Sequence, residues 1–222
     1  KYILESSDKY EIRFRLIEYI ELLKNKVHEC IAVLIDPSFI NNEAFKTIKD
    51  ICNDNNIQII VDLKTISKIR DKGNIFVIGV FKKYKSSLSN NKHLVLYNIN
   101  DTGCIGTIIR SMAGFDFSNL VLIDCNIDLF DEHLIRSTMG AFFKTNIKEY
   151  KTIKDYTNEY KNQEYINITS KGNSLSTINT LNNISLIFSK NPLEIKNIKH
   201  IEFKENISLD NIVNIVLFTL YK

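Results

Sequence analysis

Several absences narrow what this chain can be. Trp does not occur among the 222 residues, whereas Lys, Asn and Ile are abundant. This bias is typical of AT-rich coding, so a single lysine carries little functional information. No apolar run reaches the roughly 20 residues that cross a bilayer, and no secretory signal opens the sequence. We therefore expect no membrane partner.

The cysteines exclude two further kinds of site. None of the four is spaced as C-x-x-C, so we expect no zinc site and no other metal site. Four scattered cysteines in a chain of this length are also too few for a disulfide framework. A reducing compartment follows, and we predict a cytoplasmic protein.

The overall composition is that of an ordinary folded protein. Hydrophobic residues make up 44% of the chain and charged residues 25%, which supplies a core for one large domain or two small ones. The formal net charge of +3 permits an RNA partner but does not require one.

The first third of the sequence predicts alternating helices and strands. Its apolar residues either recur at helical spacing or run continuously, as they do in buried strands. Helices are expected over 10–26, 42–53 and 63–70, and strands over 30–35, 57–61 and 75–80. This alternation predicts a small α/β unit with a largely parallel sheet.

A polar stretch over 82–92 lacks periodicity and marks a domain boundary. We place an N-terminal domain at 1–88 and a second domain at 89–222. Lys82 and Lys83 open the stretch beside aromatic residues, a mixture found where proteins contact single-stranded RNA. A solvated linker is the other interpretation, and the residues alone favour it.

The second half predicts another α/β unit. Strands are expected at 93–97, 120–123, 165–169 and 185–188, and helices at 103–113, 132–141 and 209–221. The last helix carries its apolar residues on one stripe, as an amphipathic helix does.

The most informative segment, 101–115, follows a predicted strand and opens a helix. Gly106, Arg110 and Gly114 are four residues apart and therefore share one face of that helix. A guanidinium flanked by residues without side chains leaves room for a phosphate or a ribose, and arginine binds phosphates through its forked donors. A glycine-rich turn with a surface arginine explains the pattern equally well.

Two other segments carry little information by themselves. Arg136 lies four residues before Gly140 on a predicted short helix. Ser208 suits the N-cap of the last helix, and Asp210 suits its positively polarised first turn. Helix structure alone accounts for Ser208 and Asp210.

Taken in order, these segments resemble the motifs of SpoU/TrmH-type RNA methyltransferases, which belong to the knotted SPOUT class. The first motif (N-x-G-x-I-x-R), the R-A-S-x-G segment, the second motif (L-x-F-G-x-E-x-x-G) and the third motif (I-P-M, then S-L-N) correspond to 104–110, 136–140, 186–193, and 201–203 with 208–210. The run at 126–138 is most similar to the thiostrepton-resistance type of these enzymes.

The resemblance implies a C-terminal α/β domain that is tied in a trefoil knot and binds S-adenosylmethionine. It also implies an N-terminal domain similar to a ribosomal RNA-binding protein and a homodimer formed through the C-terminal domain. The implied reaction is 2′-O-ribose methylation of RNA, with ribosomal RNA as the expected substrate and transfer RNA as the other candidate.

The resemblance further implies three sets of site residues. The catalytic set is Arg110, Cys104, Ser208 and Asp210; the cofactor set is Phe188, Ser189, Lys190, Asn191, Ile201, Ser208 and Leu209; the RNA-binding set is Arg110, Arg136, Lys82 and Lys83. Because a free guanidinium is too basic to act as a general base, we expect Arg110 to hold the target nucleotide and to stabilise the developing oxyanion.

The sequence departs from the family pattern at some of these positions. Cys104 stands where the family has Asn, Ser189 where it has Gly, Asn191 where it has Glu, and Asp210 where it has Asn. These changes keep a second hypothesis open, a weak or inactive relative that binds RNA or another protein. An unrelated α/β small-molecule enzyme is a third hypothesis, which a structure without a C-terminal knot would favour.

Overall fold

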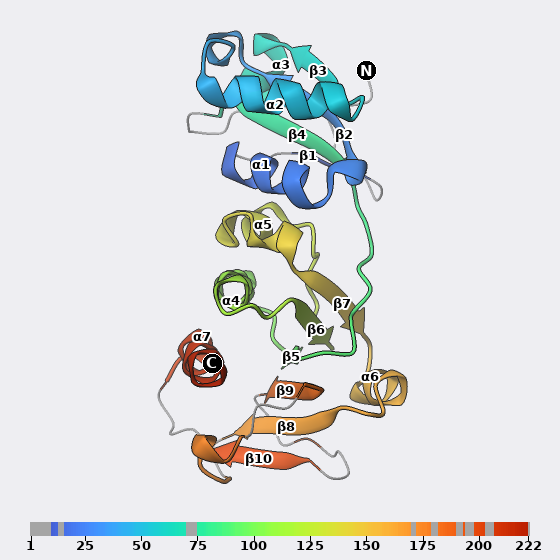
Figure 1. Cartoon of the computed structure of the whole chain (residues 1–222), viewed down its shortest axis with the longest axis vertical. Coiled ribbons are helices and arrows are strands. Elements are labelled where there is room, and N and C mark those ends of the chain that lie inside the picture. The colour runs from blue at the N-terminus through green and yellow to red at the C-terminus, as the bar shows by residue number, and fades with distance from the viewer. Residues whose placement is uncertain are drawn as a thin grey trace. The chain divides into compact units, whose positions relative to one another are not determined.

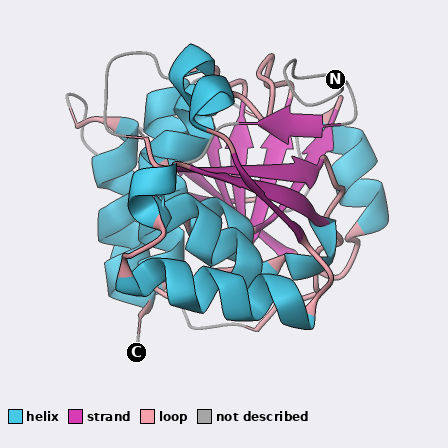
Figure 2. Cartoon of the chain, turned by 90° about the horizontal axis from the view of Figure 1, so that it is seen from above, coloured by secondary structure: helices cyan, strands magenta, loops and turns pink. Residues whose placement is uncertain are grey.

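The computed structural model describes residues 10–12, 16–69, 75–169, 172–178, 182–189, 193, 198–202 and 207–221. The chain divides into two compact units. The first unit consists of the described residues up to Tyr84 together with Phe130–Lys144. The second unit consists of Lys85–Leu129 together with the described residues from Thr145 onward. Both units contain helices and strands, which Figure 2 shows in cyan and magenta. Within the described ranges, no helix is long and apolar enough to cross a bilayer.

The first unit contains a four-stranded sheet (Figure 1). Its elements are β1 (Tyr10–Ile12), α1 (Leu16–Asn25), β2 (Cys30–Ile35), α2 (Glu43–Asp54), β3 (Gln58–Val61), α3 (Leu63–Ile69), β4 (Val77–Lys82) and α5 (Glu132–Ser137), with 3-10 segments at Val27–Glu29, Pro37–Phe39 and Ala141–Lys144. Helix α2 begins where the sequence predicts because the Asn42 side chain accepts a hydrogen bond from the Ala44 amide at 2.9 Å.

Two predictions for the first unit are wrong. The sheet has the order β1-β4-β2-β3, and only β2 and β3 are parallel, whereas β4 is antiparallel to both β2 and β1. A fully apolar run such as β4 shows that a strand is buried but not which way it runs. Residues 10–12 form a strand rather than the start of a helix, because three residues are too few for periodicity to separate the two.

Residues 130–144 pack onto the elements of the first unit. Gly140 has φ +88°, and a Cβ atom there would lie 2.8 Å from Cγ of Glu21 on α1. The Phe143 ring meets the Phe81 ring edge-on at 5.7 Å, and Lys144 pairs with Glu21 at 3.0 Å. The predicted helix over 132–141 therefore ends early, at Ser137, because the chain turns through positive φ at Met139 and Gly140.

The second unit contains a six-stranded sheet in which every pair of neighbouring strands is parallel. Its elements are β5 (His93–Tyr97), α4 (Thr102–Gly114), β6 (Asn119–Ile123), β7 (Asn146–Tyr150), α6 (Ile153–Glu159), β8 (Glu164–Thr169), β9 (Ile184–Ser189), β10 (Lys199–Glu202) and α7 (Leu209–Leu220), with a 3-10 segment at Leu175–Thr177. The strand order is β10-β8-β9-β5-β6-β7. The α/β unit predicted for this half is confirmed, and its sheet is parallel throughout the described strands.

Helices cover both faces of this sheet, with α4 and α7 on one face and α6 on the other (Figure 1). The Phe115 ring, at the end of α4, contacts the rings of Phe218 and Tyr221 at the end of α7, at 6.4 and 5.6 Å. Because their C-terminal ends meet, α4 and α7 run in the same direction. Their N-terminal ends therefore lie toward the same edge of the sheet.

The connection from β8 to β9 passes along the outer edge of β10. The Asn173 amide donates to the His200 carbonyl at 2.8 Å, and the Glu202 amide donates to the Asn173 carbonyl at 2.9 Å. Strand β10 thus has β8 on one side and Asn173 on the other. Gly172 permits this approach, because a Cβ atom there would lie 2.5 Å from the His200 carbonyl group.

Candidate functional site at the carboxyl edge of the parallel sheet

The order of the six strands defines a switch point. The chain leaves β5 toward β6 on one side, and it leaves β9 toward β10 on the other side, while β5 and β9 are neighbours. In open parallel sheets, ligands bind outside the carboxyl ends of strands at such a point. Here those ends are Tyr97 and Ser189, which are paired in register.

Helix α4 starts directly beyond this edge. The Asp101 carboxylate caps it by accepting a hydrogen bond from the Cys104 amide at 3.0 Å. Arg110 is exposed and has no hydrogen bond or ion pair within the described ranges. The expected free space exists beside Gly114, where an added Cβ atom would meet nothing within 4 Å, but not beside Gly106, which is buried.

Helix α7 starts from Ser208, which has the extended backbone of an N-cap but makes no side-chain cap hydrogen bond. The expected capping by its hydroxyl is therefore not observed. Ser208 is exposed, and its hydroxyl has no partner in the part of the chain that the structure describes. Leu209 and Asp210 follow in the first turn and are half-buried.

The strand residues of the predicted cofactor set differ in what they can offer. Phe188 on β9 and Ile201 on β10 are buried, at 1% and 2% exposure, so their side chains belong to the core. Only their backbones could face a ligand. Ser189 is half-buried at the end of β9. Lys190 and Asn191 lie outside the described residues.

Asn167 on β8 is a polar residue that the motifs did not single out. Its side chain is fully buried, and its Oδ1 atom accepts a hydrogen bond from the Ser189 hydroxyl at 3.3 Å. Its Nδ2 atom has no hydrogen-bond partner among the described residues. An amide between two isoleucines in a buried strand is the signal that could have identified it.

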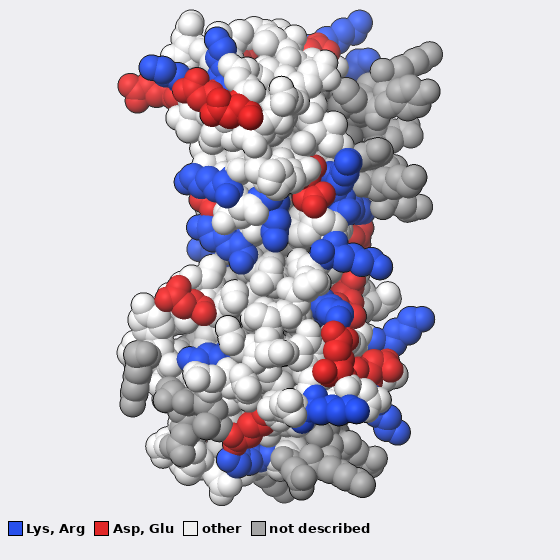
Figure 3. Space-filling view, turned by 45° about the vertical axis from the view of Figure 1, so that its right-hand side comes forward, with Lys and Arg blue, Asp and Glu red and all other residues white. Residues whose placement is uncertain are grey.

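The other predicted RNA-binding residues all lie in the first unit. Arg136 on α5 pairs with Glu132 at 3.4 Å, and Lys82 is exposed at the end of β4. The Lys83 ammonium lies 5.5 Å from the centre of the Phe130 ring. Lysine and arginine side chains are interspersed with acidic ones in Figure 3.

The amino edge of the same sheet carries a different polar cluster. Nδ1 of the His93 ring is hydrogen-bonded to the Tyr156 hydroxyl at 2.8 Å, and Nε2 of the same ring lies 2.6 Å from the Ser89 carbonyl. A carbonyl only accepts, so Nε2 carries the proton. Burial lowers the pKa of His93 below 6.5 and favours the neutral ring, whose Nδ1 then accepts from Tyr156. Ser185 bonds the same Tyr156 hydroxyl at 2.6 Å.

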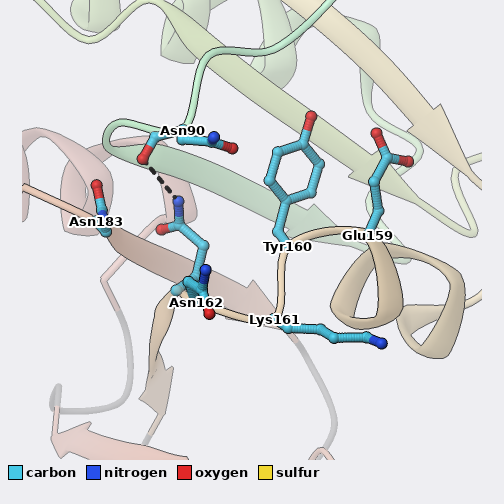
Figure 4. Close-up of a pocket in the computed structure, with 7 residues that line it drawn as sticks. Asn90, Glu159, Tyr160, Lys161, Asn162 and Asn183 are labelled. Atoms are coloured by element: carbon cyan, nitrogen blue, oxygen red, sulfur yellow. Dashed lines mark hydrogen bonds between the residues drawn. The ribbon is translucent and has the colours of Figure 1, made fainter.

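A hollow of about 170 Å³ opens beside this cluster (Figure 4). It is lined by Asn90, Glu159, Tyr160, Lys161, Asn162, Gln163 and Asn183. Among them, Gln163 donates to the carbonyls of Asn90 and Asn91, at 3.2 and 3.0 Å. None of the motif residues lines it, and it lies at the edge opposite to the switch point.

The fold of the whole chain recurs in solved structures of RNA-modifying enzymes. The SpoU methyltransferase AviRb from Streptomyces viridochromogenes, in complex with AdoMet, superposes with a TM-score of 0.78 at 11% identity, covering 99% of this chain and 94% of that one. A structure described as an RNA 2′-O ribose methyltransferase superposes with a TM-score of 0.69 at 13% identity, covering 98% and 92%. At these identities the likeness establishes the fold.

The sequence supplies the family. Residues 91–190 match the SpoU rRNA Methylase family. Human rRNA methyltransferase 3, mitochondrial, is 31% identical over 93 residues, which cover 36% of this chain and 22% of that protein. Residues 91–190 are thus similar to the SpoU rRNA Methylase family, and the resemblance inferred from the motifs is confirmed.

Proposed function

We propose that this chain transfers a methyl group from S-adenosylmethionine to the 2′-hydroxyl of a ribose in RNA, with ribosomal RNA as the substrate. The proposal depends mainly on two polar side chains, one on α4 and one at the start of α7. Arg110 and Ser208 lie on two helices that run side by side, and neither side chain has a partner within the described ranges. Ribosomal RNA is favoured by the family match and by the name of the human relative.

The residues at the switch point fit S-adenosylmethionine. The edge offers the unpaired hydroxyl of Ser208 and the unpaired, buried amide donor of Asn167 beside apolar core. Ser189, the backbone at Ile201, and Ser208 with Leu209 would hold the cofactor, together with Lys190 and Asn191. When bound, the cofactor supplies the activated methyl group and its leaving group.

The protein then has to position the ribose and stabilise its oxygen as the proton leaves. Arg110 is the matched residue suited to this task, because its forked donors are exposed beside the free space at Gly114. Cys104 and Asp210 complete the proposed catalytic set at the starts of α4 and α7. The Cys104 amide is bonded to the Asp101 carboxylate that caps α4.

The path of the β8–β9 connection supports a knotted C-terminal domain. Strand β10 lies between β8 and Asn173, and Asn173 belongs to the connection that follows β8 along the chain. Homodimerisation through the C-terminal domain is supported by an exposed apolar stripe on α7: Ile215, Phe218 and Tyr221 are 43%, 70% and 54% exposed.

The first unit is the proposed RNA-binding part, with Lys82, Lys83 and Arg136. Its Lys26 and Lys83 ammonium groups lie 5.3 and 5.5 Å from the ring centres of Tyr84 and Phe130, which combines charge with aromatic faces. Division of the chain at residues 88 and 89 remains a prediction, as does a cytoplasmic location. The human relative is described as mitochondrial.

The proposal is tested with purified protein, S-adenosylmethionine carrying a labelled methyl group, and ribosomal RNA. We expect label in the RNA, and mass spectrometry of its nucleosides to find it on the ribose 2′-oxygen. Absence of cofactor binding by calorimetry at millimolar concentration would overturn the proposal. Label on a base would keep the methyltransferase but reject the 2′-O assignment.

A further inference from the structure

Asn167 is the most informative polar residue outside the motifs. It lies in β8 at 0% exposure, and its two register neighbours are Ile187 on β9 and His200 on β10. Its carboxamide is half satisfied: Oδ1 accepts from Ser189 at 3.3 Å, and Nδ2 has no partner among the described residues.

An unpaired amide donor in a strand interior is unfavourable for the ligand-free protein. A leucine of similar shape would fill the same space without that penalty, and the residues on either side in the strand are both isoleucine. Unsatisfied groups of this kind need an explanation, and a ligand is one. The group therefore points to a function rather than to packing.

The position of Asn167 connects it with the switch point. Alternation along β8 puts its side chain on the same face as Tyr165, which packs with Ile187 in the cluster under α6. Tyr97 and Leu193 pack against that cluster. The Ser189 hydroxyl that bonds Asn167 comes from the end of β9, beside the end of β5.

The surroundings select among the parts of the cofactor. The residues of this face at the strand ends, Tyr97, Thr169 and Ser189, carry no charge. A neutral donor next to aromatic and aliphatic side chains suits a flat heterocycle with ring nitrogens better than a carboxylate, which would need a cation. Adenine has this chemistry, whereas the methionine end of the cofactor does not.

We propose that Asn167 is a specificity-determining residue that donates from Nδ2 to a ring nitrogen of the adenine of S-adenosylmethionine. Ser189 keeps the carboxamide in the required orientation by bonding its oxygen. This inference rests on the proposed function, because it assumes the same cofactor. It adds a residue in β8 to a cofactor site assembled from β9, β10 and α7.

The test compares the protein with Asn167→Leu in two measurements. Thermal unfolding of the cofactor-free proteins should give an equal or higher Tm for the variant, since an unpaired donor is removed. Calorimetry with S-adenosylhomocysteine should show affinity weakened by roughly 3- to 30-fold. Asn162→Leu, at the opposite edge of the sheet, is the matched control and should bind normally.

Analogues that lack one ring nitrogen (the 1-, 3- and 7-deazaadenine forms) identify the contact. One of these analogues should bind the unmodified protein more weakly than S-adenosylhomocysteine does, by the same factor by which Asn167→Leu weakens the binding of S-adenosylhomocysteine. The Asn167→Leu variant should bind that analogue no more weakly than it binds S-adenosylhomocysteine. Equal affinity of variant and parent for S-adenosylhomocysteine would overturn the inference and leave the proposed function intact. A variant that still discriminates among the analogues would also overturn it. No binding by the unmodified protein would overturn both.

Discussion

The two edges of the six-stranded sheet use polar residues in opposite ways. At the amino edge, buried groups satisfy one another: His93, Tyr156 and Ser185 form a continuous chain of hydrogen bonds. At the carboxyl edge, the Ser208 hydroxyl and the Nδ2 atom of Asn167 have no partner within the described ranges, and neither does Arg110 further along α4. The first arrangement stabilises a fold, and the second leaves donors for a ligand.

The largest effect is expected at Arg110 on α4 and should be on activity alone. Arg110→Ala should lower methyl transfer roughly 100- to 1,000-fold, as removal of one oxyanion-stabilising donor does. The Tm should not change, because the exposed side chain has no described contact to lose. The measurement is initial rate under saturating RNA and cofactor, beside cofactor affinity, which should stay close to that of the parent.

Arg110→Lys is the matched control for that prediction. It keeps the charge but loses the forked donors, so activity should lie between that of the parent and that of the alanine variant. Full activity in Arg110→Ala would contradict the assignment of the unpaired polar groups to function.

The amino edge should respond to substitution through stability. Tyr156→Phe removes the hydroxyl that bonds both His93 and Ser185, and it should lower the free energy of unfolding by about 1–3 kcal/mol. Denaturant titration measures it. Tyr97→Phe, at the carboxyl end of β5, removes a hydroxyl for which no described residue is a partner, and it should change stability much less. Equal effects would show that the edges do not differ.

Acid should weaken the amino edge before it affects carboxylates elsewhere. Burial lowers the pKa of His93 in the folded protein, so the unfolded chain binds the proton more readily. This contribution to stability is complete above about pH 6.5 and is lost as the pH falls from there toward the lowered pKa. Denaturant midpoints at pH 7.5 and 5.5 should therefore differ, and the difference should shrink in His93→Gln. An unchanged difference would assign it to other groups.

The smallest expected effect on stability distinguishes the N-terminal caps of α4 and α7. Asp101 caps α4 through a 3.0 Å hydrogen bond, so Asp101→Ala should reduce stability by about 1 kcal/mol. Ser208 makes no cap bond, so Ser208→Ala should change stability by less than about 0.5 kcal/mol while weakening cofactor binding. A large loss of stability in Ser208→Ala would mean that its hydroxyl serves the helix after all.

Elements with strong patterns could be predicted from the sequence, and elements without them could not. The strands at 93–97 and 185–188 are continuous apolar runs, and the structure has them as β5 and β9. Strand β7 was missed because only Ile147 of its five residues is buried. The direction of β4 and the packing of 130–144 onto the first unit depend on distant contacts that no local pattern carries.

The candidate site was predictable in part for a similar reason. Motif order located Arg110 and Ser208, because both fall in segments that correspond to family motifs and lie on or before predicted helices. The state of each polar group was not predictable. Ser208 has the residue type of a cap without its hydrogen bond, and Asn167 is informative only because one of its atoms lacks a partner.

The position of β10 has a consequence for the order of assembly. Both of its neighbours, β8 and Asn173, precede it along the chain and are joined by a short segment. During synthesis that segment leaves the ribosome first, so the pairing of Asn173 with β10 cannot form until β10 has been made. Completion of this side of the sheet is then a late step, and pairings between parallel strands that are distant in sequence form slowly.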